Sequence, residues 1–184
     1  MDDLATLLPI AAFIALAAGL AVVLRGTGRI VARTREVELF RGTVRDLAAR
    51  VDASLGGAAG QIDAVRRRQV GPDTIVDTID AAKDAVARYI DEANAIRGPR
   101  KTQRIRSDLI ADLERSQRAL EMVEHGTSIL VNVRRGPREL EAQTAIKRGY
   151  LNLIHAREAF ARNALVALEF ELDPKGQKER HGSV

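Results

Sequence analysis

The chain has 184 residues, which is the size of one ordinary domain, with no Cys, no Trp and only 3% aromatic residues. The absence of cysteine excludes a disulfide scaffold, a thiolate zinc site and a cysteine nucleophile. The small number of aromatic residues, together with only 14 Gly, argues against a β-sandwich or a β-barrel. The composition therefore favours an all-α protein, and its three His residues leave little for an imidazole metal cluster.

The segment 4–24 has no charged residue. As a helix with ~1.5 Å rise per residue it would be roughly 31 Å long, which matches a hydrocarbon core of about 30 Å. We therefore predict a transmembrane helix over 4–24. A cleaved signal peptide is the alternative, although its N-terminal region should be positive and here Asp2 and Asp3 make it acidic. Ala11, Ala15 and Gly19 are spaced so that two membrane helices could pack closely.

Basic residues follow the predicted span and indicate its orientation. Arg25, Arg29, Arg33 and Arg35 come before Glu36, which is the first acidic residue after the span. By the positive-inside rule the rest of the chain lies in the cytoplasm and residues 1–3 lie outside. We expect a single-pass protein of the cell membrane, whose basic juxtamembrane segment, 25–35, contacts lipid headgroups.

Three Gly-Pro steps divide the remainder of the chain: Gly71-Pro72, Gly98-Pro99 and Gly136-Pro137. A Gly can end one helix in a left-handed conformation, and a Pro can begin the next. The steps leave segments of roughly 30–70, 72–97, 99–135 and 137–172. Long helices with short connections pack as antiparallel neighbours. We therefore predict an up-down bundle of about four long helices over 36–173, followed by a disordered polar tail, 174–184.

Apolar residues recur in each segment at alternating steps of three and four, the pattern of helices that pack nearly parallel. In the first segment the expected core residues are Val37, Phe40, Val44, Leu47, Val51, Leu55, Ala58, Ile62 and Val65. In the second they are Ile75, Ile79, Ala82, Val86, Tyr89, Ala93 and Ile96. In the third they are Leu109, Leu113, Ser116, Leu120, Val123, Thr127 and Leu130. In the fourth they are Leu140, Leu151, Ile154, Ala161, Leu165, Leu168 and Leu172.

The run Gly56-Gly57-Ala58-Ala59-Gly60 interrupts the first of these segments. Each Gly inside a helix costs roughly 1 kcal/mol relative to Ala. We expect the helix to kink or break here; the alternative is that a neighbouring helix packs closely against the smooth patch.

The patterns that would indicate an enzyme are missing from the sequence. No Glu-x-x-His pair suits a diiron bundle, no Ser lies in a Gly-x-Ser-x-Gly turn, and no phosphate-binding P-loop occurs. We therefore predict a protein that is not an enzyme and that carries no cofactor and no metal.

Charged residues gather in three places. Asp77, Asp80, Asp84 and Asp91 share one side of the second predicted helix, either as a solvated face or as an acidic docking stripe for a basic partner or a second copy. Basic clusters occur at Arg66-Arg67-Arg68 and at Arg100, Lys101, Arg104 and Arg106. Such clusters suit nucleic acid or anionic lipid, but nucleic acid is not an expected partner because no aromatic residues interleave them.

The sequence thus predicts a membrane-anchored cytoplasmic helical bundle that acts as a non-enzymatic scaffold or interaction subunit. Its expected partners are membrane lipids, through the anchor, and an unknown protein or a second copy. Two alternatives remain: a signalling or regulatory helical relay, and a bundle that binds a small ligand in its core.

Overall fold

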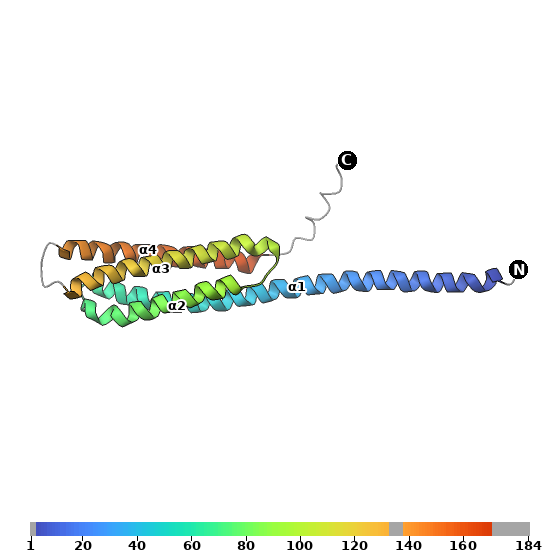
Figure 1. Ribbon diagram of the computed structural model, residues 1–184, viewed down its shortest axis with the longest axis horizontal. Coiled ribbons are helices and arrows are strands. Elements are labelled where there is room, and N and C mark those ends of the chain that lie inside the picture. The colour runs from blue at the N-terminus through green and yellow to red at the C-terminus, as the bar shows by residue number, and fades with distance from the viewer. Residues whose placement is uncertain (1–2, 133–137, 171–184) are drawn as a thin grey trace, which may run out of the picture. The chain divides into compact units, whose positions relative to one another are not determined.

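The computed structural model of the chain describes the backbone of residues 3–132 and 138–170 and the side chains of residues 32–132 and 138–170. Four long helices make up this part: α1 (Asp3–Arg66), α2 (Val76–Ala95), α3 (Gln103–Asn132) and α4 (Arg138–Glu169) (Figure 1). Short 3-10 helices, η1 (Pro72–Ile75) and η2 (Arg100–Thr102), precede α2 and α3. No strand occurs in the described residues, so the predicted all-α fold is confirmed.

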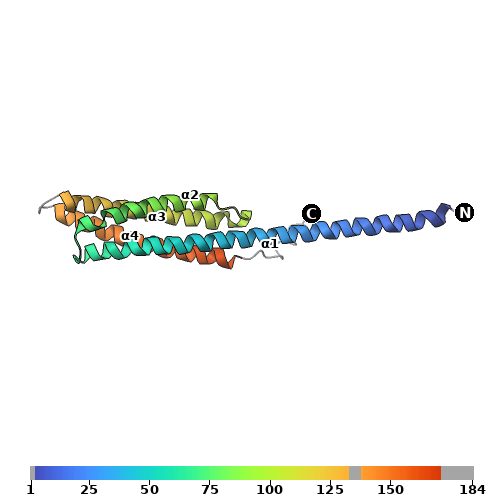
Figure 2. The same cartoon turned by 90° about the horizontal axis from the view of Figure 1, so that it is seen from below.

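The chain divides into two units, and the helical bundle is the unit Leu39–Glu171. Its four helices lie side by side in both views (Figures 1 and 2). Side-chain pairs join each helix to two neighbours: Arg50–Glu92 between α1 and α2, Lys83–Glu124 between α2 and α3, Asp112–Asn163 between α3 and α4, and Asp52–Arg157 between α1 and α4. Neighbouring helices run in opposite directions, so the predicted antiparallel up-down bundle is confirmed.

The two ends of the bundle are named after the residues of α1 that lie there. At the Leu39 end, Arg41 Nη2 donates to the carbonyl oxygen of Phe170 beyond α4, at 2.5 Å, and Phe40 packs against Gly98 between α2 and α3. At the Arg66 end, Arg68 lies 3.6 Å from Glu139 at the start of α4. The connection from α2 to α3 is therefore at the Leu39 end, and the one from α1 to α2 is at the Arg66 end.

The expected core stripes of the first three helices are confirmed. Every expected position from Val37 to Val65 and from Ile75 to Ile96 is buried, as are those of α3 except Leu130, which is half-buried. Ser116 and Thr127 fit among apolar residues because each hydroxyl donates to a carbonyl oxygen one turn earlier, at 3.0 and 2.8 Å.

The expected core stripe of α4 is wrong at most of its positions, although Ile154 and Leu168 are half-buried and Ile154 packs against the core. Leu140, Leu151 and Leu165 are 74%, 43% and 58% exposed, Ala161 is exposed, and Leu172 lies outside the described residues. The stripe that faces the core runs through Ala142, Ile146, Gly149, Leu153, Ala156, Phe160, Ala164 and Ala167. These residues are mostly small because α3 and α4 approach closely. A Cβ on Gly149 would lie 2.6 Å from Val123 Cγ2, and one on Gly126 would lie 2.7 Å from the carbonyl oxygen of Ala142.

The expected break at Gly56–Gly60 is also wrong, because α1 continues through it to Arg66. Leu55, Ala58, Ala59 and Ile62 are buried on either side of the glycines. Burial of a Leu or Ile side chain such as Leu55 or Ile62 contributes about 1.5–3 kcal/mol, which exceeds the cost of one helical Gly. The alternative of close packing applies at most to Gly56, whose Cβ would lie 3.4 Å from Arg157 Nη2; nothing lies within 4 Å at Gly57 or Gly60.

The first two Gly-Pro steps do separate helices, and Pro72 begins η1 as expected. The left-handed residue that ends α1 is not Gly71, which is extended at φ −71°, but Arg68 at φ 60°. The amides of Arg68 and Gln69 donate to the carbonyl oxygens of Val65 and Ala64, both at 2.8 Å. This is the hydrogen-bond pattern of a Schellman motif, in which the left-handed position usually holds Gly.

Several predictions fall outside the described residues. None of the helices, over the residues described, combines the length and the apolar character that a membrane crossing requires. The predicted span 4–24 belongs to the part of α1 whose side chains are not described, as do Ala11, Ala15, Gly19, Arg25 and Arg29. The Gly136-Pro137 step and the tail 174–184 are likewise outside. Arg33 and Arg35 are described and exposed.

Candidate functional site

The four aspartates of the predicted acidic stripe all lie on α2 and are all exposed: Asp77, Asp80, Asp84 and Asp91. Asp80 lies 3.9 Å from Lys83, whose closer partner is Glu124 at 2.6 Å. No ion pair joins Asp77, Asp84 or Asp91 to a described residue. The structure therefore brings the four together on one exposed surface, and their role in docking stays a prediction.

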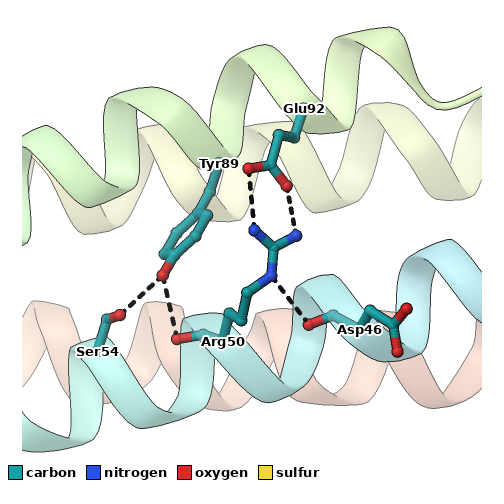
Figure 3. Close-up of polar contacts among 5 residues, drawn as sticks. All are labelled: Asp46, Arg50, Ser54, Tyr89 and Glu92. Carbon is teal, nitrogen blue, oxygen red and sulfur yellow. Dashed lines mark hydrogen bonds and ion pairs between the residues drawn. The ribbon is translucent and has the colours of Figure 1, made fainter.

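A polar cluster joins α1 to α2 (Figure 3). Arg50 donates from both terminal nitrogens to Glu92, at 3.0 and 2.5 Å, and its guanidinium lies 5.6 Å from the centre of the Tyr89 ring. The Tyr89 hydroxyl lies 2.8 Å from Ser54 Oγ. The hydrogen bond from Arg50 lowers the pKa of Glu92 and the same bond raises the pKa of Arg50. The polar groups of this cluster therefore contact one another and hold α1 and α2 together.

Asp112 on α3 is a buried carboxylate, 1% exposed. Its Oδ1 accepts from Arg115 at 2.8 Å and its Oδ2 accepts from Asn163 of α4 at 2.7 Å. A buried charge needs such partners. Both oxygens are thus occupied, and the contact with Asn163 fixes α3 against α4.

The basic cluster Arg66-Arg67-Arg68 lies at the Arg66 end and is largely neutralised. Arg66 and Arg67 reach Asp63 at 2.6 and 2.7 Å, and Arg68 lies 3.6 Å from Glu139. The two arginines on Asp63 lower the pKa of its carboxyl, the hydrogen bond from Arg66 most of all. This cluster therefore presents few unpaired charges.

The second basic cluster has a different environment. It lies at the Leu39 end, where the segment 97–104 carries Arg97, Arg100, Lys101 and Arg104 and no acidic residue. All four side chains are exposed, and no ion pair joins any of them to a described residue. Arg106 instead donates to the carbonyl oxygen of Ile96, at 3.1 Å, which ties the connection to α3. The sequence shows the cluster but not its position at the Leu39 end of the bundle.

The outer face of α4 was missed because its residues were assigned to the core. Leu140, Leu151 and Leu165 are exposed there. An apolar groove of about 250 Å³ lies between α1 and α4 and is lined chiefly by Ala48, Val51, Phe160, Ala161, Leu165 and Leu168. A second groove, of about 570 Å³, includes Met122, Leu140 and Thr144. The sequence of α4 contains two heptad patterns, and this could have indicated that one of them lies on an outer face.

A cavity of about 1110 Å³ opens at the Arg66 end and includes Arg66, Arg68, Glu139 and Lys147 in its wall. It is wide and its charges have mixed sign. Within residues 32–132 and 138–170, no group of three or more His, Asp or Glu side chains could hold a metal ion.

No protein-family model, no curated protein and no solved structure matches this chain.

Proposed function

We propose that this chain is a membrane-anchored helical bundle that serves as a scaffold or interaction subunit, with its bundle on the cytoplasmic side. The observation that carries the proposal is the position of the unpaired basic cluster, at the Leu39 end of the bundle. The charge-free run 4–24 and the arginines of 25–35 precede Leu39 in the chain. If the charge-free run is an anchor, the chain reaches Leu39 from a membrane, and the unpaired cations at the Leu39 end could bind the headgroups of that membrane. A bundle free in solution would give these cations no such partner.

Electrostatics explains how the basic cluster would act. The cytoplasmic leaflet carries a negative surface potential, and each Lys or Arg close to it contributes about 1 kcal/mol. The cluster at 97–104 is available for this contact because none of its four cations forms an ion pair with a described residue. The cluster at the Arg66 end is not comparable, since Asp63 and Glu139 already hold its arginines.

A scaffold role is supported by how the polar groups inside the bundle are used. Among the described residues of the bundle, the buried polar side chains are Thr102, Asp112, Ser116 and Thr127, and each makes a hydrogen bond that stabilises the fold. The distinctive features lie instead on outer faces, in the acidic stripe of α2 and the apolar residues of α4. Such exposed features suit protein contacts.

Membrane fractionation tests the anchor. The full chain should remain in the membrane pellet after washes in high salt and in alkaline carbonate, whereas a chain that starts at Arg35 should be released. Recovery of the full chain in the soluble fraction would contradict the proposal.

Matched charge variants test the basic cluster. For the chain that starts at Arg35, replacing Arg100, Lys101 and Arg104 with Gln should weaken binding to anionic phosphatidylglycerol vesicles at least tenfold, given about 1 kcal/mol per charge. The same change at Arg66, Arg67 and Arg68 removes equal charge at the other end and should have a smaller effect. Equal loss in both variants would show that only net charge matters.

A further inference from the structure

Helix α4 carries a second heptad stripe beside the one that faces the core. Its members follow alternating steps of four and three, and we call them the outer stripe: Leu140, Thr144, Lys147, Leu151, Ile154, Glu158, Ala161, Leu165 and Leu168. All are exposed or half-buried. An apolar heptad stripe is the surface with which one helix packs on another. In the described bundle the neighbours of α4 pack chiefly against its core stripe. Ile154 also packs partly against the core, and the other residues of the outer stripe are exposed or half-buried.

We propose that the outer stripe binds the outer stripe of a second copy of this chain, with the two α4 helices antiparallel. A second copy is then the partner of the proposed scaffold. Because the interface lies wholly within the bundle, it forms whether or not residues 4–24 enter a membrane.

The outer stripe matches itself when one helix is reversed. A single register pairs Leu140 with Leu165, Thr144 with Ala161, Lys147 with Glu158 and Leu151 with Ile154, and the twofold axis repeats each pair. Every layer is therefore apolar, small or oppositely charged. In an isologous dimer residue i contacts residue j and j contacts i, which is the relation these pairs have.

The charges of the outer stripe select the antiparallel arrangement. In a parallel dimer each heptad position meets its own equivalent, so Lys147 would face Lys147 and Glu158 would face Glu158. Both contacts repel, whereas the antiparallel register converts them into two attractive pairs. Glu141 and Arg162, which flank the stripe and are exposed, also come together in this register. The antiparallel register thus replaces two like-charged layers with two oppositely charged pairs, and Glu141 and Arg162 add two more.

The ends of the outer stripe have complementary shapes. Leu140, near one end, is the most exposed large apolar side chain among those described, at 74%. Leu165, near the other end, borders the apolar groove of about 250 Å³ between α1 and α4. The antiparallel register places Leu140 of each copy over the groove of the other. Burial of these leucines removes the largest exposed apolar groups of α4 from water.

Cysteine cross-linking of the full chain in mild detergent tests the orientation, and the natural absence of Cys makes each introduced thiol unique. A mixture of L140C and L165C chains should form a mixed disulfide under mild oxidation, while L140C alone should not cross-link. In the antiparallel dimer the two copies of residue 140 are separated by roughly 37 Å, at the rise of 1.5 Å per residue. Cross-linking of L140C with itself would instead show a parallel pair and overturn the proposal, as would the absence of any mixed disulfide.

Charge exchange gives a second test that does not depend on thiols. Lys147→Glu and Glu158→Lys should each weaken the dimer roughly tenfold in sedimentation equilibrium, since each turns two attractive pairs repulsive. The double variant K147E/E158K should restore binding. Asp84→Lys makes the same change in charge as Glu158→Lys but lies on α2, and it should leave the dimer unchanged. Failure of the double variant to recover, or a monomeric wild type, would overturn the proposal; circular dichroism checks that each variant remains folded.

Discussion

Replacing both Gly57 and Gly60 with Ala should stabilise the bundle. The two residues lie in the interior of α1, both are exposed, and a Cβ at either position would have no atom within 4 Å. The added methyl groups therefore meet no steric resistance. Their effect is chiefly to restrict the unfolded chain, which loses less backbone entropy on folding.

The expected size follows from helix propensity. Ala is favoured over Gly by about 0.5–1 kcal/mol at each exposed position within a helix. The double variant should therefore gain about 1–2 kcal/mol. For a bundle of this size that corresponds to a rise of roughly 3–10 °C in the thermal midpoint.

The assay is thermal unfolding of residues 35–173, followed by far-ultraviolet circular dichroism because the chain has no Trp and only two Tyr. That fragment should unfold cooperatively without detergent, since its core stripes are largely filled by its own helices. An unchanged or lower midpoint in the double variant would refute a continuous helix through residues 56–60, because replacing Gly with Ala stabilises the fold only if these residues are helical.

The same assay serves three further predictions. Gly126→Ala or Gly149→Ala should each cost about 1–3 kcal/mol, since the new Cβ would lie within 2.7 Å of α4 or α3 atoms; a stabilised variant would contradict the close approach. Asp112→Ala should cost about 1–3 kcal/mol because it removes the hydrogen bonds that the buried carboxylate accepts from Arg115 and Asn163, and a higher thermal midpoint would contradict this. Glu92→Gln should cost less than about 1 kcal/mol at neutral pH, because the pair with Arg50 is half-exposed. Since the folded pKa of Glu92 is lowered from 4.5, that contribution is present above pH 4.5 and lost as the pH falls through the folded pKa; a difference that persists at pH 2 would contradict it.

The first three core stripes could be predicted from the sequence because large apolar residues dominate them. Phe40, Leu47, Ile79 and Leu113 are all buried at heptad spacing, as expected. Helix α4 has two heptad stripes, and we predicted that the one with more leucines faces the core. The stripe that faces the core is instead the one with Gly149, because the close contact between α3 and α4 needs small side chains. The sequence of α4 alone could not show which stripe faces the core, because that depends on how closely α3 approaches.

The surfaces were predicted less completely than the fold. The acidic stripe on α2 follows from spacing alone, because a surface helix must expose one side. The different environments of the two basic clusters could not be predicted in this way. The ion pair between Arg68 and Glu139, for example, joins residues that are far apart in the sequence. The unbroken α1 was missed for a related reason: helix propensity is local, whereas burial of Leu55 and Ile62 depends on the whole bundle.

The orientation of the bundle relative to a membrane tests the central claim most directly. Two reporters should be fused in separate chains after Val184, one active only in the cytoplasm and the other only outside it. The proposed anchor and the arginines that follow it predict that the cytoplasmic reporter alone is active, with both fusions found in the membrane fraction. Activity of the external reporter, with the cytoplasmic one silent, would contradict the proposed membrane-anchored cytoplasmic scaffold.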